Sequence, residues 1–90
     1  SERYERLLFE EKTRNKSIAE YKSFIKNYPG SPYTAFAQKE VFEISTAKGD
    51  PDDFFAYLKE NPDSPYRQFI NDLLFHLYKE QDETVPDAIL

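Results

Sequence analysis

The chain has one histidine, His76, so it is the first residue to test for chemistry. Asp72 and Glu80 lie four residues before and after it, and on a helix all three side chains would share one face. Three ligands on consecutive turns of one helix cannot surround an ion. We therefore interpret His76 as a residue at a helix edge that forms a charge pair, and we expect no metal site there.

A second acidic group, Asp50, Asp52 and Asp53, brackets Pro51. A calcium-binding hand needs ligands at defined spacings and a closing glutamate, and this loop has neither. Aspartate before a proline is instead typical of a helix N-cap, and acids in the first turn are stabilised by the helix dipole. The group predicts the start of a helix.

Nucleophilic and phosphate-binding sites also lack their components. There is no cysteine, which excludes disulfides and thiol chemistry, and the two glycines cannot form a glycine-rich phosphate loop. The serines and threonines have no histidine partner in a strand–turn–helix elbow. The remaining carboxylates are interpreted as solvated helix faces: Glu10, Glu11, Glu40, Glu43 and Glu80. We expect no enzymatic activity and no cofactor.

Composition limits the class of partner. The net charge is -5 and the pI is about 4.8, so nucleic acid and anionic membrane surfaces are poor partners. No apolar run approaches the roughly 20 residues that a membrane span needs. Seven tyrosines and eight phenylalanines supply the core, and the scarcity of glycine and β-branched residues favours helices.

The stretch from Tyr28 to Tyr33 has a near copy from Asn61 to Tyr66, 33 residues later. The same offset aligns further apolar pairs: Tyr21/Phe54, Phe24/Tyr57, Ile25/Leu58, Phe36/Phe69, Val41/Leu74, Phe42/Phe75 and Ile44/Leu77. An internal repeat with a period in the thirties is typical of stacked helical hairpins.

Each copy contains the signals of a tight helix–helix corner. Pro29 and Pro62 cannot continue a helix, so the preceding residues should end one. Ser31 and Ser64 are good N-caps, and the prolines that follow them suit the first helical position. So short a turn predicts two antiparallel helices.

We therefore expect one domain, all-α, with about five helices stacked as a right-handed solenoid. It would comprise a leading helix over 1–14, repeats over 17–49 and 50–83, and the start of a further helix over 84–90. Within the repeats, helices are expected over 17–27, 32–48, 52–60 and 65–80. Ser17 and Glu20 predict a capping box at the first of these, and Gly49 is expected to end the second as a left-handed cap. The leading helix would carry Tyr4, Leu7 and Leu8 on one stripe. The expected core stripes are Tyr33, Phe36, Ala37, Val41 and Ile44, and then Tyr66, Phe69, Ile70, Leu73, Leu74 and Leu77.

The two corners resemble the "YPxSPY" junctions of bacterial tetratricopeptide-like repeats. Tyr21-x-x-Phe24-Ile25 and Phe54-x-x-Tyr57-Leu58 match the aromatic run that precedes such junctions, and Ala37 matches the alanine six residues after the serine. Similar junctions occur in outer-membrane assembly lipoproteins and periplasmic Tol-associated coordinators. The resemblance implies a protein-binding scaffold in the bacterial periplasm or cell envelope, with the cytoplasm as the other compartment. It implies no shared ligand.

Phe9, Phe42 and Phe75 recur at the repeat period on the side away from the expected core. Either they join each hairpin to its neighbour, or the last of them helps to form an aromatic pocket for a partner. For the second reading, the predicted partner-binding residues are Phe55, Arg67, Asn71, Phe75 and Tyr78.

The predicted function is therefore a protein–protein interaction or assembly module, with a protein or peptide partner and with self-association through open repeat ends as one form of it. The alternatives are a structural spacer or capping segment for a neighbouring domain of a longer chain, and a peptide-sensing domain with a small ligand.

Overall fold

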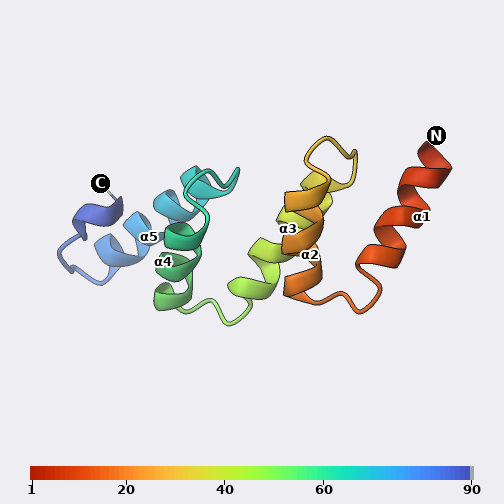
Figure 1. Cartoon of the computed structure of the whole chain (residues 1–90). Coiled ribbons are helices and arrows are strands. Elements are labelled where there is room, and N and C mark those ends of the chain that lie inside the picture. The colour runs from red at the N-terminus through yellow and green to blue at the C-terminus, as the bar shows by residue number, and fades with distance from the viewer. Residues whose placement is uncertain (90) are drawn as a thin grey trace. The chain divides into compact units, whose positions relative to one another are not determined.

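A computed structural model describes residues 1–89, which form five α-helices and no strand. The helices are α1 (Glu2–Lys12), α2 (Ile18–Asn27), α3 (Thr34–Ser45), α4 (Pro51–Glu60) and α5 (Arg67–Glu80), followed by a short 3-10 helix, η1 (Asp87–Ile89) (Figure 1). They form two compact units, Ser1–Ala47 and Lys48–Leu90. The prediction of an all-α fold with five helices is confirmed for the described residues.

Side chains cap the N-termini of α1, α2 and α4. Ser1 accepts the backbone N–H of Tyr4 at 3.2 Å. At α2 the predicted capping box is present, since Ser17 Oγ accepts from Glu20 N at 3.2 Å and Glu20 Oε1 accepts from Ser17 N at 3.1 Å. Asp50 caps α4 by accepting from Asp52 N at 3.0 Å. These bonds satisfy N–H groups that have no partner within the helix.

The two corners close α2 and α4 where the prolines require, but α3 and α5 begin later than predicted. They start at Thr34 and Arg67 and not at Pro32 and Pro65. Between serine and helix lies a tight turn, in which Thr34 N donates to Ser31 O at 3.2 Å. Ser31 Oγ accepts from Tyr33 N at 3.0 Å, so the serine caps this turn and not the first α-helical turn itself.

The local geometry of the corners recurs 33 residues later. Tyr66 N donates to Ser64 Oγ at 3.0 Å, as Tyr33 N does to Ser31 Oγ. The backbone bonds of the first corner also reappear in the second, for example Ala37 N to Tyr33 O and Ile70 N to Tyr66 O, each at 3.0 Å. The same proline and serine signals therefore produce the same backbone path twice.

Helix ends follow the same interval. Lys16, Gly49 and Asp82 have positive φ angles of 53°, 71° and 54°, and each lies 33 residues from the next. Gly49 was the predicted left-handed residue, since glycine has no Cβ to oppose this conformation. The other two positions were not predicted.

The ends of α1 and α3 share a further detail. Thr13 and Thr46 are both buried, and each hydroxyl donates at 2.7 Å to a carbonyl one turn back, that of Phe9 or Phe42. These pairs are also 33 residues apart. The last turn of α1 therefore has the local geometry of the last turn of α3.

Each unit has its own core. In the first unit it comprises Phe9, Tyr21, Phe24, Ala37 and Val41. In the second it comprises Phe54, Tyr57, Leu58, Ile70, Leu74 and Ile89. In unit 1, α2 packs along α3 and α1 contacts α2; in unit 2, α4 and η1 both contact α5.

The prediction that Phe36 and Phe69 are core positions is wrong. They are 47% and 58% exposed, and the predicted core residue Ile44 is 42% exposed. The buried residues of α3 are Thr34, Ala37 and Val41, and Phe36, one residue before Ala37, points about 100° away from it. The Phe36 ring instead meets the Phe9 ring of α1 edge on, at 5.7 Å between centroids.

The expected helix over 84–90 is only partly present. Residues 83–86 are irregular, and η1 provides a single turn that buries Ile89 against α5. Leu90 lies outside the described residues. Among residues 1–89, no helix combines the length and the apolar character needed to cross a membrane.

Ser31→Ala and Ser64→Ala should each lower the free energy of unfolding by about 0.5–2 kcal/mol, because each leaves a tyrosine N–H unpaired. Ser64→Ala should cost more, since Ser64 Oγ also bonds the hydroxyl of Tyr57 at 2.5 Å. Denaturant melts followed by circular dichroism measure both, with Lys26→Ala as the exposed control. Equal midpoints for all three variants would contradict the capping assignment.

Candidate functional site

Phe9 is the centre of an aromatic cluster in unit 1. Its ring is 8% exposed. It stacks on Tyr33 at 5.1 Å between centroids and meets the edges of Phe24 and Phe36 at 4.9 and 5.7 Å. Tyr21 is 6.3 Å away. Phe9 therefore joins α1 to the hairpin of α2 and α3.

A polar contact supplements this cluster. The hydroxyl of Tyr33 donates to Glu2 Oε1 at 2.8 Å. This bond links the first turn of α1 to the end of the corner between α2 and α3. The hydrogen bond to Glu2, followed by desolvation, raises the pKa of the Tyr33 phenol.

The opposite face of α1 is apolar and exposed. Tyr4 is 64% exposed, Leu7 is 49% exposed and Leu8 is half-buried. At 100° per residue, Tyr4 and Leu8 form one stripe that lies about 100–140° round the helix from Phe9. The helix thus has two apolar faces, of which only the one with Phe9 is packed.

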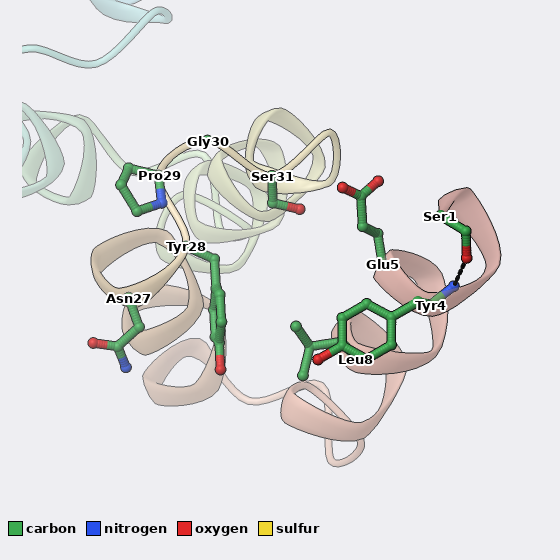
Figure 2. A pocket seen from close by; sticks show the side chains of 9 residues that line it. All are labelled: Ser1, Tyr4, Glu5, Leu8, Asn27, Tyr28, Pro29, Gly30 and Ser31. Carbon is green, nitrogen blue, oxygen red and sulfur yellow. Dashed lines mark hydrogen bonds between the residues drawn. The ribbon is translucent and has the colours of Figure 1, made fainter.

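The exposed stripe forms one wall of a cleft of about 490 Å³. Its lining residues are Ser1, Tyr4, Glu5 and Leu8 from α1 and its cap, and Asn27, Tyr28, Pro29, Gly30 and Ser31 from the corner after α2. Figure 2 shows the Tyr4 ring and the Leu8 side chain extending from α1 toward Tyr28, with the corner closing the other side. Glu5 is the one charged residue of this lining.

A second hollow of about 620 Å³ lies on the other side of α1. Its lining residues are Phe9, Glu10, Thr13, Arg14, Lys16, Tyr21, Phe36 and Glu40. With two acidic and two basic side chains, this lining carries no net charge. Burial, then the charges of Glu40 and Glu20, raises the pKa of the Tyr21 phenol.

The partner-binding residues predicted from sequence lie in unit 2. Arg67, Asn71, Phe75 and Tyr78 share one face of α5, because they are separated by four, four and three residues. Phe55 lies on α4 and is half-buried. The structure therefore brings four of the five onto a common helix face, and their role in binding stays a prediction.

The surroundings of this α5 face are only partly open. Phe75 is half-buried, with Lys79 Nζ 5.6 Å above its ring and the His76 ring 6.2 Å away, edge on. Asn71 Oδ1 is buried and has no hydrogen-bond partner. Arg67 is exposed.

Tyr78 borders a smaller hollow of about 250 Å³ at the end of α5, together with Gly49, Pro51, Leu77, Gln81 and Glu83. Within residues 1–89, no group of three or more histidine, aspartate or glutamate side chains is arranged to hold a metal ion.

The cleft beside α1 was not predicted from sequence. The sequence predicts Tyr4, Leu7 and Leu8 on one apolar stripe of a leading helix, and Phe9 recurs at the repeat period. Taken together, these two features indicate the cleft. An apolar stripe and a phenylalanine on different faces of one helix predict two contact surfaces.

No family model, no characterised relative and no solved structure matches the chain.

Phe9→Ala should lower the free energy of unfolding of unit 1 by about 3–5 kcal/mol, since it removes a buried ring that contacts four others. Phe36→Ala should cost less, because that ring is 47% exposed. Thermal melts compare the two. Phe9→Leu keeps apolar volume and is the folded reference if Phe9→Ala does not fold. A larger cost for Phe36→Ala would contradict the central position of Phe9.

Asn71→Leu should leave unit 2 equally stable or make it more stable, because the buried Oδ1 of Asn71 has no partner and its desolvation costs about 1–3 kcal/mol. Gln68→Leu is the control, since Gln68 is exposed and donates to Asp72 at 2.9 Å. A loss of more than about 1 kcal/mol in Asn71→Leu alone would mean that the amide has a partner in solution.

Proposed function

We propose that this chain is a non-catalytic protein-interaction module built from degenerate, tetratricopeptide-like helical hairpins, and that the cleft beside α1 is its binding site. The observation that carries the proposal is the unpacked apolar face of α1. Tyr4 is 64% exposed and Leu7 is 49% exposed on a helix whose Phe9 side is already buried.

Exposed apolar side chains that gather on one element indicate an interaction surface, whereas single ones are ordinary. Tyr4 and Leu7 are two such residues on α1, and Tyr4 borders a hollow together with the half-buried Leu8. Tyrosine is also common among residues that dominate binding energy, because its ring buries a large area and its hydroxyl keeps a polar contact.

The recurring corner geometry supports the repeat part of the proposal. Hydrogen bonds, capping serines and left-handed residues all recur at 33 residues. Hairpins of that period bury a continuous core by stacking and expose shared surfaces to partners. The bacterial envelope is the proposed compartment, on the resemblance of the corners alone.

A photo-reactive benzophenone side chain tests the proposal. Placed at Tyr4 it should give a discrete cross-linked product in a lysate of the source cells, since it replaces an exposed ring at the cleft wall. Placed at Lys39, whose side chain is 54% exposed on α3, it should give none.

Leu8→Glu in the Tyr4 variant should abolish the product, because the acid makes the apolar wall charged while helix α1 is retained. Circular dichroism checks that the helix content is unchanged. No product at Tyr4, or the same product from both positions, would overturn the proposal and favour a purely structural spacer.

A further inference from the structure

The hollow lined by Phe9 and Phe36 contains a buried tyrosine whose hydroxyl has no hydrogen-bond partner. Tyr21 lines this hollow and is 3% exposed. Within residues 1–89 its hydroxyl takes part in no hydrogen bond, whereas Tyr57, which is equally buried, bonds Ser64. A buried phenol usually has such a partner, because its desolvation otherwise costs free energy.

The Tyr21 hydroxyl is also open to the hollow. Asn71 Oδ1 is the single side-chain oxygen or nitrogen of residues 1–89 that is both unpaired and enclosed by protein. The unpaired oxygen of Tyr21 is therefore not enclosed, and it keeps contact with the space that its side chain lines. A ligand in this hollow can supply the missing hydrogen bond.

The repeat architecture does not account for the polar groups of this hollow. Its phenylalanines and its threonine recur unchanged 33 residues later, as Phe42, Phe69 and Thr46. The counterpart of Tyr21 is Phe54, which is 7% exposed and so packs without a hydroxyl. Three of the four charged residues are also replaced by uncharged ones: Glu40 by Leu73, Arg14 by Ala47 and Lys16 by Gly49.

The charged side chains around Tyr21 have both signs. Glu40 is half-buried on α3, and its charge contributes, after burial, to the raised pKa of the Tyr21 phenol. Glu10 is exposed on α1, and Arg14 and Lys16 are exposed in the loop after it. Within residues 1–89 none of these four is in an ion pair. A ligand with one positive and one negative group therefore finds both countercharges in one hollow.

We propose that this hollow binds a short peptide with free termini. The terminal ammonium group pairs with Glu40 and Glu10. The terminal carboxylate pairs with Arg14 and Lys16, and the Tyr21 hydroxyl donates to the carbonyl next to the ammonium group. This hollow shares no lining residue with the cleft beside α1, so the inference goes beyond the proposed function and does not depend on it.

The size and layout of the hollow favour a peptide over a single ion or a free amino acid. Its volume of about 620 Å³ lies within the roughly 300–1,000 Å³ of ligand sites. The half-buried acid is on α3, whereas both bases follow α1, so the ligand must carry its two charges at separate ends. A peptide does so, and its side chains can contact the aromatic walls.

The tripeptide alanyl-leucyl-alanine, with both termini free, is the probe. The isotope-labelled full chain is titrated with it and followed by nuclear magnetic resonance. Saturable shifts are expected at the backbone amides of residues 13–16, 21 and 36–40, which surround the hollow. The N-acetylated and the C-amidated tripeptides should each bind about tenfold more weakly, because each lacks one charged end.

Tyr21→Phe should weaken binding of the free tripeptide by about three- to tenfold, as loss of one hydrogen bond does. The thermal midpoint should not fall, because the hydroxyl has no protein partner and Phe54 occupies the equivalent position. This pair of readouts separates a binding role of the hydroxyl from a structural one.

Two further variants assign the charged ends. Glu40→Gln should weaken binding of the free tripeptide by about tenfold, but it should leave the affinity of the acetylated one unchanged. Arg14→Gln should act in the same way on the free and the amidated tripeptides. Glu43→Gln is the matched control on α3, since Glu43 is exposed and does not line the hollow, and it should keep the affinity within about twofold.

Four results would overturn the inference. They are no saturable shift at the amides around the hollow, equal affinities for the free and the capped tripeptides, an unchanged affinity in Tyr21→Phe, or an equal loss in Glu43→Gln and Glu40→Gln. Binding of free leucine as tight as that of the tripeptide would also exclude a peptide as the ligand class. The cross-link at Tyr4 tests the cleft separately, so either site can fail without the other.

Discussion

The burial of Phe9 is the contact on which unit 1 depends. Its ring meets rings from α2, from the corner and from α3, so a single side chain fixes how α1 lies against the hairpin. Because aromatic pairs prefer stacked or edge-on arrangements, several such contacts restrict rotation of α1 about its axis. The hydrogen bond from Tyr33 to Glu2 also restricts this rotation, at the first turn of α1. The orientation of α1 in turn decides which side chains remain exposed.

The corners show how few residues determine a backbone path. In each, proline stops a helix, serine accepts one N–H, and a second proline opens a tight turn. These are local effects, so they follow from sequence, and the capping box at Ser17 and the cap at Asp50 were predicted for the same reason. The start of α3 was placed early because Ser31 caps a tight turn before the α-helix, a distinction that sequence signals do not make.

Side-chain burial was harder to predict than the helices, and Phe36 illustrates why. Hydrophobicity alone places a phenylalanine in the core, but the buried residues of α3 are Thr34, Ala37 and Val41. Phe36 lies about 100° round the helix from Ala37, so its ring lies at the helix edge and is 47% exposed. The cleft beside α1 was missed for a related reason. It depends on the angle between Phe9 and the Tyr4–Leu8 stripe together with the position of the Tyr28 corner, and only the folded unit combines them.

Helix α1 cannot bury both of its apolar faces against one hairpin. Phe9 and the Tyr4–Leu8 stripe point about 100–140° apart, so turning the stripe inward would expose the ring that makes four aromatic contacts. The packed face is stabilised by more contacts, and the other remains in water at a cost that scales with its apolar area. A helix that covers this second face removes that area from water without disturbing the first. The same face of α3, covered by α2, is the internal example of that solution.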